Sequence, residues 1–104
     1  MELQVSRTRD PRGLRLSGEV DASNAAHLGR ALAAETARGG DVTLDLSHVA
    51  FLDSTGLEHL IRAARALEGN GRLILVSPQQ QIRRLFELVL LDRRANVEIR
   101  NGTP

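Results

Sequence analysis

The sequence predicts an α/β fold, with a mixed, mostly parallel sheet of about five strands and helices mainly on one face. Apolar residues alternate with polar ones in several short segments, recur at helical spacing between them, and are bounded by Gly or Pro. The order is strand, strand, helix, strand, helix, strand, helix, strand, and crossovers of this length favour right-handed parallel units. The 104 residues suit one domain. We place a single domain at residues 1–100 and a frayed tail at 101–104.

The first half of the chain is predicted to form a hairpin, a helix and a third strand. Leu3 and Val5 alternate with polar neighbours, and the pattern returns over 14–20 after the turn RDPRG. Residues 25–35 then carry apolar side chains at helical spacing until a Gly-Gly pair ends the helix. Strict alternation over 42–46 indicates a strand with one apolar face, so we expect the sheet to be covered better on one side.

The second half is predicted to add two helices and two strands. Apolar residues over 57–67 give the clearest helix, which GNG ends, and RLILV is typical of a central strand buried on both faces. Pro78 is expected to open the last helix, and NVEIR is the last strand. The inward side chains of that helix are expected to be Ile82, Leu85, Phe86 and Val89. We interpret the apolar run 88–91 as core in preference to an interface.

Composition excludes several classes of function. The net charge is +1, the basic residues are all arginine and interspersed with acids, and two Phe with no Tyr or Trp offer little for base stacking, so we expect no nucleic-acid partner. The absence of cysteine removes disulfides and thiolate chemistry. No apolar run approaches the roughly 20 residues that span a bilayer, and no secretory signal is visible. We expect a cytoplasmic protein with no membrane partner.

Polar residues gather where strands pass into helices, at GEVDASNA, FLDSTGL and LVSPQQQ. Function in open α/β sheets collects beyond the carboxyl ends of the strands. In FLDSTGL the local pattern alone favours helix capping over any functional role, but capping accounts for one of Asp53, Ser54 and Thr55 and not for all three. Gly56, inside the first turn, costs up to about 1 kcal/mol relative to alanine, which points to a close approach of another backbone. A hydroxyl here would be exposed at a helix start.

The turn GEVDASNA has the same character. Asp21, Ser23 and Asn24 are all good N-cap residues, and capping again explains only one. Asp21 ends the strand predicted to lie next to the strand that leads to Asp53. The topology therefore predicts that both acids rim one surface.

Enzyme hypotheses have little support in the sequence. No G-x-S-x-G elbow surrounds Ser54, and the nearest histidines, His48 and His59, belong to a strand end and to an exposed-looking helix position. The histidines show no metal-ligand spacing, and no glycine run matches a phosphate-binding loop. We expect no catalytic residue, metal or cofactor.

Taken together, LSGEVDASNAAHL, VTLDLSHVAFLDSTGLEHLI and GRLILVSPQQQIRRLFELVLLD resemble the STAS domain over nearly the whole chain. The resemblance is greatest to the single-domain anti-sigma factor antagonists of bacteria. It implies that Ser54, directly after the aspartate, is a phosphorylation site. It also implies partner contacts by the neighbours of Ser54 and by the turn before the first helix, namely Asp21, Ser23, Asn24, Asp53, Thr55 and Gly56.

The resemblance implies a partner-switching role. The unphosphorylated protein would bind an anti-sigma factor serine kinase and so free a sigma factor, the kinase would phosphorylate it using ATP, and a serine phosphatase would reset it. The implied state is a monomer or weak dimer. Glu58 stands where the family often has a small residue, which would alter the choice of kinase. The alternative is a STAS regulatory or accessory subunit of a transporter or stress-signalling complex, without phosphorylation.

Overall fold

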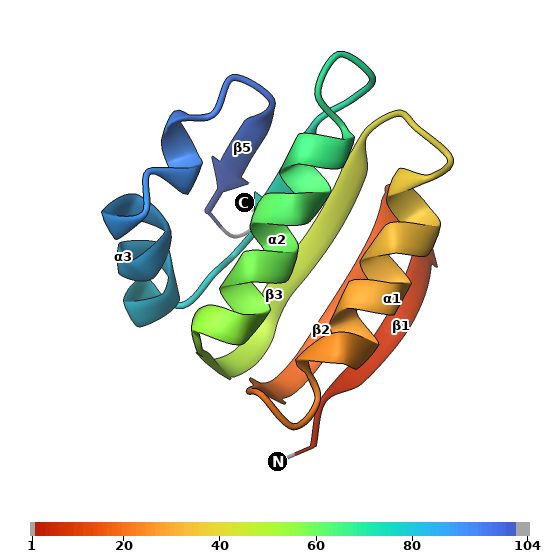
Figure 1. Ribbon diagram of the computed structural model, residues 1–104. Coiled ribbons are helices and arrows are strands. Elements are labelled where there is room, and N and C mark those ends of the chain that lie inside the picture. The colour runs from red at the N-terminus through yellow and green to blue at the C-terminus, as the bar shows by residue number, and fades with distance from the viewer. Residues whose placement is uncertain (1, 102–104) are drawn as a thin grey trace.

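The structure is a computed structural model that describes residues 2–101, and its element order is the predicted one (Figure 1). Of the expected tail, residues 102–104 lie outside the described part. The strands are β1 (Gln4–Arg9), β2 (Arg12–Val20), β3 (Val42–Leu52), β4 (Leu73–Val76) and β5 (Val97–Arg100). The helices are α1 (Ala25–Thr36), α2 (Ser54–Ala66) and α3 (Gln80–Leu88), followed by the short 3-10 helix η1 (Leu91–Arg93).

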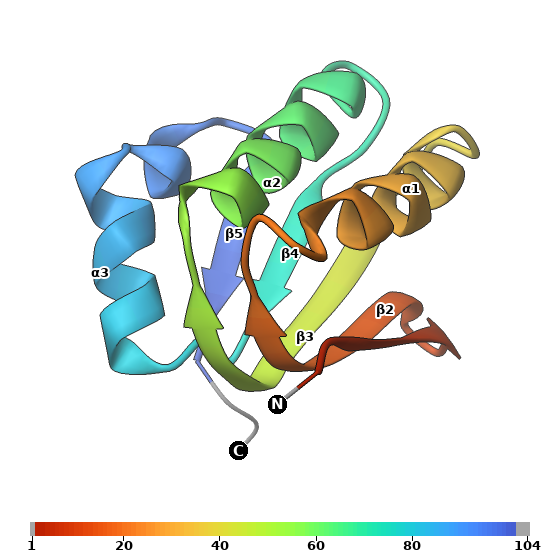
Figure 2. The same ribbon diagram turned by 60° about the horizontal axis from the view of Figure 1, so that its bottom comes forward.

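The strands form one sheet in the order β1-β2-β3-β4-β5. Strand β1 pairs antiparallel with β2, and the remaining neighbours are parallel. Because each right-handed crossover advances the sheet in the same direction, the connecting helices fall on one face. Figure 2 shows α1 and α2 across that face, with α3 on the side of β5. The expectation of one better-covered face is confirmed.

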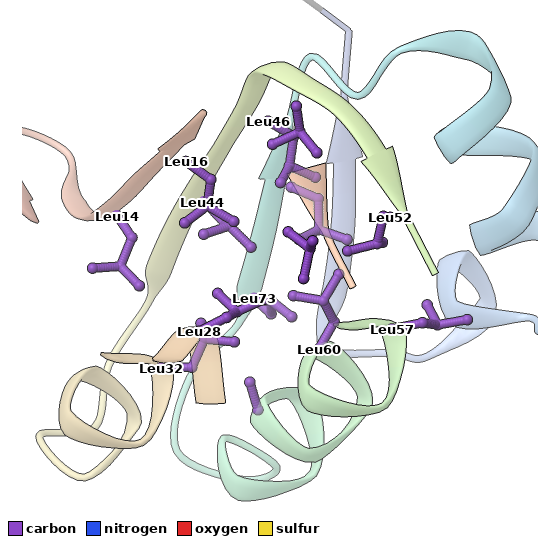
Figure 3. Packing of buried hydrophobic residues seen from close by; sticks show 14 of the residues in the cluster. Leu14, Leu16, Leu28, Leu32, Leu44, Leu46, Leu52, Leu57, Leu60 and Leu73 are labelled. Atoms are coloured by element: carbon purple, nitrogen blue, oxygen red, sulfur yellow. The ribbon is translucent and has the colours of Figure 1, made fainter. Parts of the chain in front are cut away.

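The core lies between the sheet and these helices. Figure 3 shows strand leucines meeting helix leucines: Leu14, Leu16, Leu44, Leu46 and Leu52 face Leu28, Leu32, Leu57 and Leu60. In β4, Leu73 and Leu75 join this cluster, and Ile74, on the other face, is also only 4% exposed. The prediction that this strand is buried on both faces is therefore confirmed.

The last helix differs from its prediction at both ends. Gln79 is the N-cap of α3, so Pro78 lies just before the helix and does not open it. At the other end, Val89 is the C-cap and is 42% exposed, so it is not an inner-face residue. Leu88 and Leu90 are 80% and 60% exposed, and only the fourth residue of the run, Leu91, is buried. The interpretation of this run as core is therefore wrong for three of its four residues.

Candidate functional site

Two of the three predicted turns meet at one end of the sheet. The last residues of β2 and β3, Val20 and Leu52, pair with each other in the sheet. Asp21 and Asp53 directly follow these paired residues. The backbone N–H of Asp53 donates to the carbonyl of Val20 at 3.1 Å, which ties the second turn to the first. Figure 2 shows the two turns side by side, and the predicted shared surface is confirmed.

The third turn lies apart from this pair. Strand β4 ends at Val76, which pairs with Asp45, seven residues before the end of β3 at Leu52. The segment LVSPQQQ therefore leaves the sheet well short of the edge that the other two turns occupy. One of its side chains still reaches β3 beside Phe51, because Nε2 of Gln81 donates to the carbonyl of Ala50 at 3.4 Å.

Asp53 caps α2. Its carboxylate oxygen Oδ1 accepts the backbone N–H of Thr55 at 2.9 Å and of Gly56 at 3.3 Å, and it also accepts the Thr55 hydroxyl. The hydrogen bond from the Thr55 hydroxyl is the main reason that the pKa of Asp53 is lowered, and backbone N–H groups of Gly56, Thr55 and Ala22 add to it against partial desolvation. Ala22 belongs to the first turn, so this carboxylate also links the two turns.

Ser54 is the first residue of α2, and its side chain is exposed. Its hydroxyl makes no hydrogen bond with any residue that the structure describes. A helix N-terminus carries partial positive charge, which favours an anionic group attached there, although Asp53 already accepts the N–H groups of Thr55 and Gly56. Ser54 thus presents a free hydroxyl at a position that tolerates a phosphate.

Three of the four Asp-x-(Ser/Thr) segments in the chain share one local geometry. In each, the aspartate Oδ1 accepts both the backbone N–H and the hydroxyl of the residue two places later. The pairs are Asp21 with Ser23, Asp45 with Ser47, and Asp53 with Thr55. In these three segments the aspartate occupies the hydroxyl, whereas in the fourth, Asp41-x-Thr43, the carboxylate binds Arg72 instead. Ser54, one place after its aspartate, falls outside the pattern.

The first turn is a hydrogen-bonded loop that does not cap its helix through a side chain. Asn24 is the N-cap of α1, but its side chain makes no capping bond. It accepts the N–H of Asp21 at 3.0 Å and donates to the carbonyl of Glu19 at 2.9 Å. Asp21 holds Ser23 as described above. The polar residues that the sequence placed here are used to fix the shape of the turn.

Gly56 is buried where α2 crosses the ends of β2 and β3. A Cβ at this position would lie 2.6 Å from Cδ1 of Leu52 and 2.7 Å from Cγ1 of Val20. The predicted approach of another backbone is therefore wrong, because the nearest atoms belong to side chains of this chain. Their contact with Gly56 sets how closely α2 lies on the strands.

One exposed apolar residue beside the site was not predicted. Phe51 pairs with Glu19 near the end of β3 and is 48% exposed. Strict alternation could not mark it in the sequence, because the burial pattern is irregular at this end of β3 and Ala50 and Phe51 are both exposed. The site thus combines two acids, a free hydroxyl and a phenyl ring.

The histidines do not form a catalytic arrangement with Ser54. His48 Nδ1 lies 3.1 Å from the hydroxyl of Ser47, but the carboxylate of Asp45 binds that serine and not the histidine. His59 packs over Gly29 on α1.

Among the residues that the structure describes, no cluster of His, Asp or Glu could hold a metal ion. Within the same residues, no helix has the length and apolarity needed to cross a membrane.

Comparison with known proteins gives a family match over most of the chain. The family model described as "Mlab, STAS domain" matches residues 3–100. A putative anti-sigma factor antagonist from Thermotoga maritima is 25% identical with a TM-score of 0.77, over 96% of this chain and 86% of that one. An anti-sigma factor antagonist from Mycobacterium paratuberculosis is 29% identical with a TM-score of 0.70, over 93% and 84%. The unphosphorylated form of the anti-sigma factor antagonist SpoIIAA shares the fold, with 19% identity and a TM-score of 0.70 over 98% and 90%.

Proposed function

This chain belongs to the STAS domain family, and from that premise we propose that it is an anti-sigma factor antagonist switched off by phosphorylation of Ser54. In its unphosphorylated form it binds an anti-sigma factor serine kinase and so releases a sigma factor. The kinase transfers the γ-phosphoryl group of ATP to Oγ of Ser54, the hydroxyl proton goes to a base of the kinase, and ADP leaves. A serine phosphatase reverses the modification by hydrolysis. The protein has no catalytic role of its own in this scheme and works in the cytoplasm.

The observation that carries this proposal is the free, exposed hydroxyl of Ser54 at the start of α2. The other hydroxyls of the two turns, on Ser23 and Thr55, are engaged by Asp21 and Asp53. A kinase must take the proton of the hydroxyl that it modifies, so a hydroxyl already bound to a carboxylate is the poorer acceptor. Ser54 is therefore the favoured site within the D-S-T-G segment.

The surface around Ser54 accounts for how phosphate would act. It would add about −1.5 to −2 charges at a helix N-terminus, which the fold tolerates. Asp53 and Asp21 both flank this position, so the new charge meets two existing ones. A partner fitted to a neutral hydroxyl would also have to desolvate the phosphate. A loss of about 3 kcal/mol in binding would lower affinity more than a hundredfold.

We assign the partner surface to the two joined turns. Asp21, Ser23 and Asn24 supply its first half, and Asp53 and Thr55 supply its second half, with Gly56 fixing the position of α2 beneath them. Phe51 adds an apolar contact at the rim. Large aromatic side chains often anchor protein interfaces, which supports a protein partner in preference to a small molecule.

The direct test incubates the purified protein with its cognate kinase and ATP and locates phosphate by mass spectrometry. Wild type should gain one phosphate on Ser54, and Ser54→Ala should gain none. Because the Ser54 hydroxyl bonds to nothing in the described chain, this substitution should change the unfolding free energy by no more than about 0.5 kcal/mol. Ser6→Ala, at an exposed serine on β1 outside both turns, is the matched control and should be phosphorylated like wild type. Phosphate on Thr55, or none on wild type with a kinase that it binds, would contradict the site.

A second candidate function is a STAS regulatory or accessory subunit of a transporter or stress-signalling complex. The exposed apolar residues Leu88, Val89 and Leu90 favour it, because the switch at Ser54 does not use them. Affinity capture with the unphosphorylated protein separates the two functions. Recovery of a serine kinase supports the antagonist, and recovery of transporter or stress-complex subunits without phosphorylation supports the alternative.

A further inference from the structure

A second polar site lies at the opposite end of β2 from Ser54. The turn between β1 and β2 and the last turn of α1 enclose a hollow of about 490 Å³, lined by Arg7, Thr8, Arg9, Arg12 and Arg38. We call it the arginine hollow. Strand β2 has nine residues, and at about 3.3 Å per residue it separates the hollow from the candidate site by about 25 Å. The hollow therefore requires an explanation of its own.

The cationic charge of the hollow is only partly neutralised. Glu35 on α1 is almost fully buried, and its carboxylate meets Arg7 at 2.9 Å, Arg12 at 3.5 Å and Arg38 at 3.8 Å. One carboxylate thus serves three guanidinium groups. The Arg9 side chain has no ion pair or hydrogen bond with any residue that the structure describes. The four arginines keep a formal excess of positive charge even when Glu35 and the neighbouring Asp10 are both counted.

This arrangement is unusual within the molecule. Elsewhere, Arg15–Asp45, Arg62–Glu58, Arg83–Glu87 and Arg94–Glu68 are single pairs. Glu98 meets two arginines, Arg72 and Arg100, but there Arg72 also has a second carboxylate, that of Asp41. Guanidinium groups repel one another, so gathering several of them beside one shared acid has a cost that an anionic ligand would remove.

The hydrogen-bond donors of the hollow divide into used and unused ones. Arg12 is occupied, because its terminal nitrogens donate to the backbone carbonyls of Glu35, Gly39 and Asp41 at the end of α1. Because Arg12 binds these carbonyl oxygens, their partial negative charge is not left facing an anion in the hollow. Arg7 binds Glu35 through Nε, and the Arg38 contact is too long for a hydrogen bond. The terminal nitrogens of Arg7, Arg9 and Arg38 therefore remain available, and such forks match the oxygens of a phosphate.

The hollow adjoins a second depression, and the two share Arg7 and Arg38. This second depression, which we call the apolar groove, has a volume of about 420 Å³ and runs between α1 and β1. Its lining also includes Val5, Leu14, His27, Ala31, Ala34 and Glu35. Four of its eight lining side chains, those of Val5, Leu14, Ala31 and Ala34, are aliphatic, and its one aromatic ring is the imidazole of His27.

We propose that the arginine hollow and the apolar groove together bind an organic phosphate whose substituent is apolar. The phosphate would lie against Arg7, Arg9 and Arg38, and the substituent would lie along Val5 and Ala34. The site needs neither the kinase nor Ser54, so it stands or falls independently of the proposed function.

Isothermal titration of the purified full chain at constant ionic strength tests this site with three probes: inorganic phosphate, hexyl phosphate and 1-hexanol. Hexyl phosphate should bind at least about tenfold more tightly than inorganic phosphate, because it also buries methylene groups. Hexanol should bind far more weakly than hexyl phosphate. Adenosine monophosphate binding as tightly as hexyl phosphate would overturn the apolar assignment, and hexanol binding as tightly would overturn the role of the arginines.

Variants locate the binding. Arg9→Gln and Arg38→Gln should each weaken the binding of inorganic phosphate and of hexyl phosphate about tenfold. Neither substitution removes a hydrogen bond of Glu35, whose carboxylate still accepts from Arg12. Ala34→Gln should weaken the binding of hexyl phosphate and leave the affinity for inorganic phosphate unchanged. Arg62→Gln, which removes a surface arginine on α2, is the control for net charge and should change neither. Equal weakening by Arg62→Gln and Arg9→Gln would show nonspecific charge attraction and would overturn the proposal.

Discussion

The two turns at the carboxyl ends of β2 and β3 begin alike and use their residues differently. Each starts with an aspartate whose Oδ1 holds the hydroxyl two places later, on Ser23 in one turn and Thr55 in the other. In the second turn the same carboxylate also caps α2, while α1 has no side-chain cap. Only the second turn inserts a serine directly after the aspartate, and Ser54 is left free. Within these two turns, the spacing from the aspartate therefore decides whether a hydroxyl is bound or free.

The largest effect should come from moving the hydroxyl by one position. The double variant Ser54→Ala with Thr55→Ser keeps one serine in the segment but places it where Asp53 binds the hydroxyl. We expect the cognate kinase to incorporate no detectable phosphate into it, measured by intact mass after incubation with ATP. Efficient phosphorylation at position 55 would show that the kinase reads the segment without regard to the Asp53 hydrogen bond, and the contrast between the two turns would lose its meaning.

A charge placed in each turn should separate their contributions to binding. Ser54→Asp should weaken kinase binding more than a hundredfold in titration calorimetry if it reproduces about 3 kcal/mol of lost affinity. Ser23→Asp puts the same charge into the first turn. It should weaken binding less, because Ser23 does not lie at the start of α2, where Ser54 is. Equal affinity of Ser54→Asp and wild type would count against an electrostatic switch.

The packing between the two turns predicts a stability effect. Gly56→Ala should lower the unfolding free energy by about 1–3 kcal/mol, because the new methyl group would overlap Val20 and Leu52 in the core. Gly29→Ala on α1 is the matched control. There the methyl group meets the imidazole of His59, a side-chain end that can turn away, and alanine is the better helix former. Urea titrations should rank Gly56→Ala well below Gly29→Ala, and the reverse order would exclude this packing role.

The sequence predicted the sheet and the joined turns because both depend on local patterns. Alternation located β2 and β3, and parallel crossovers then placed Asp21 beside Asp53. Which polar residue performs which task could not be predicted, since Asp53 and Ser54 are both acceptable caps and only their coordinates distinguish them. The partner-contact roles of these residues remain predictions.

The end of α3 shows where pattern reading failed. The run 88–91 was interpreted as core because four consecutive apolar residues usually are buried. In the structure α3 ends at Leu88, and Leu90 takes a left-handed conformation with φ 60°. The helix thus stops before the run does, and Leu88 to Leu90 point outward while Leu91 returns to the core. No local signal in the sequence marks that stop, because leucine is rarely found in this conformation.

The smallest predicted effect is a pH dependence that belongs to the second turn. The pKa of Asp53 is lowered in the folded protein, first by the Thr55 hydroxyl, so its ionised form favours folding. This contribution is complete above the unfolded pKa, near 4, and is lost as the pH falls through the lower folded value. Asp53→Asn keeps a good cap but lacks this contribution, so it should be somewhat less stable than wild type at pH 7 and should lose less stability between pH 5 and pH 2.5. Thr55→Val removes the main cause of the shift and should reduce the same acid loss. Urea unfolding at pH 5 and pH 2.5 measures the loss of unfolding free energy. If both variants lose as much as wild type, the Asp53 cap does not contribute to acid sensitivity.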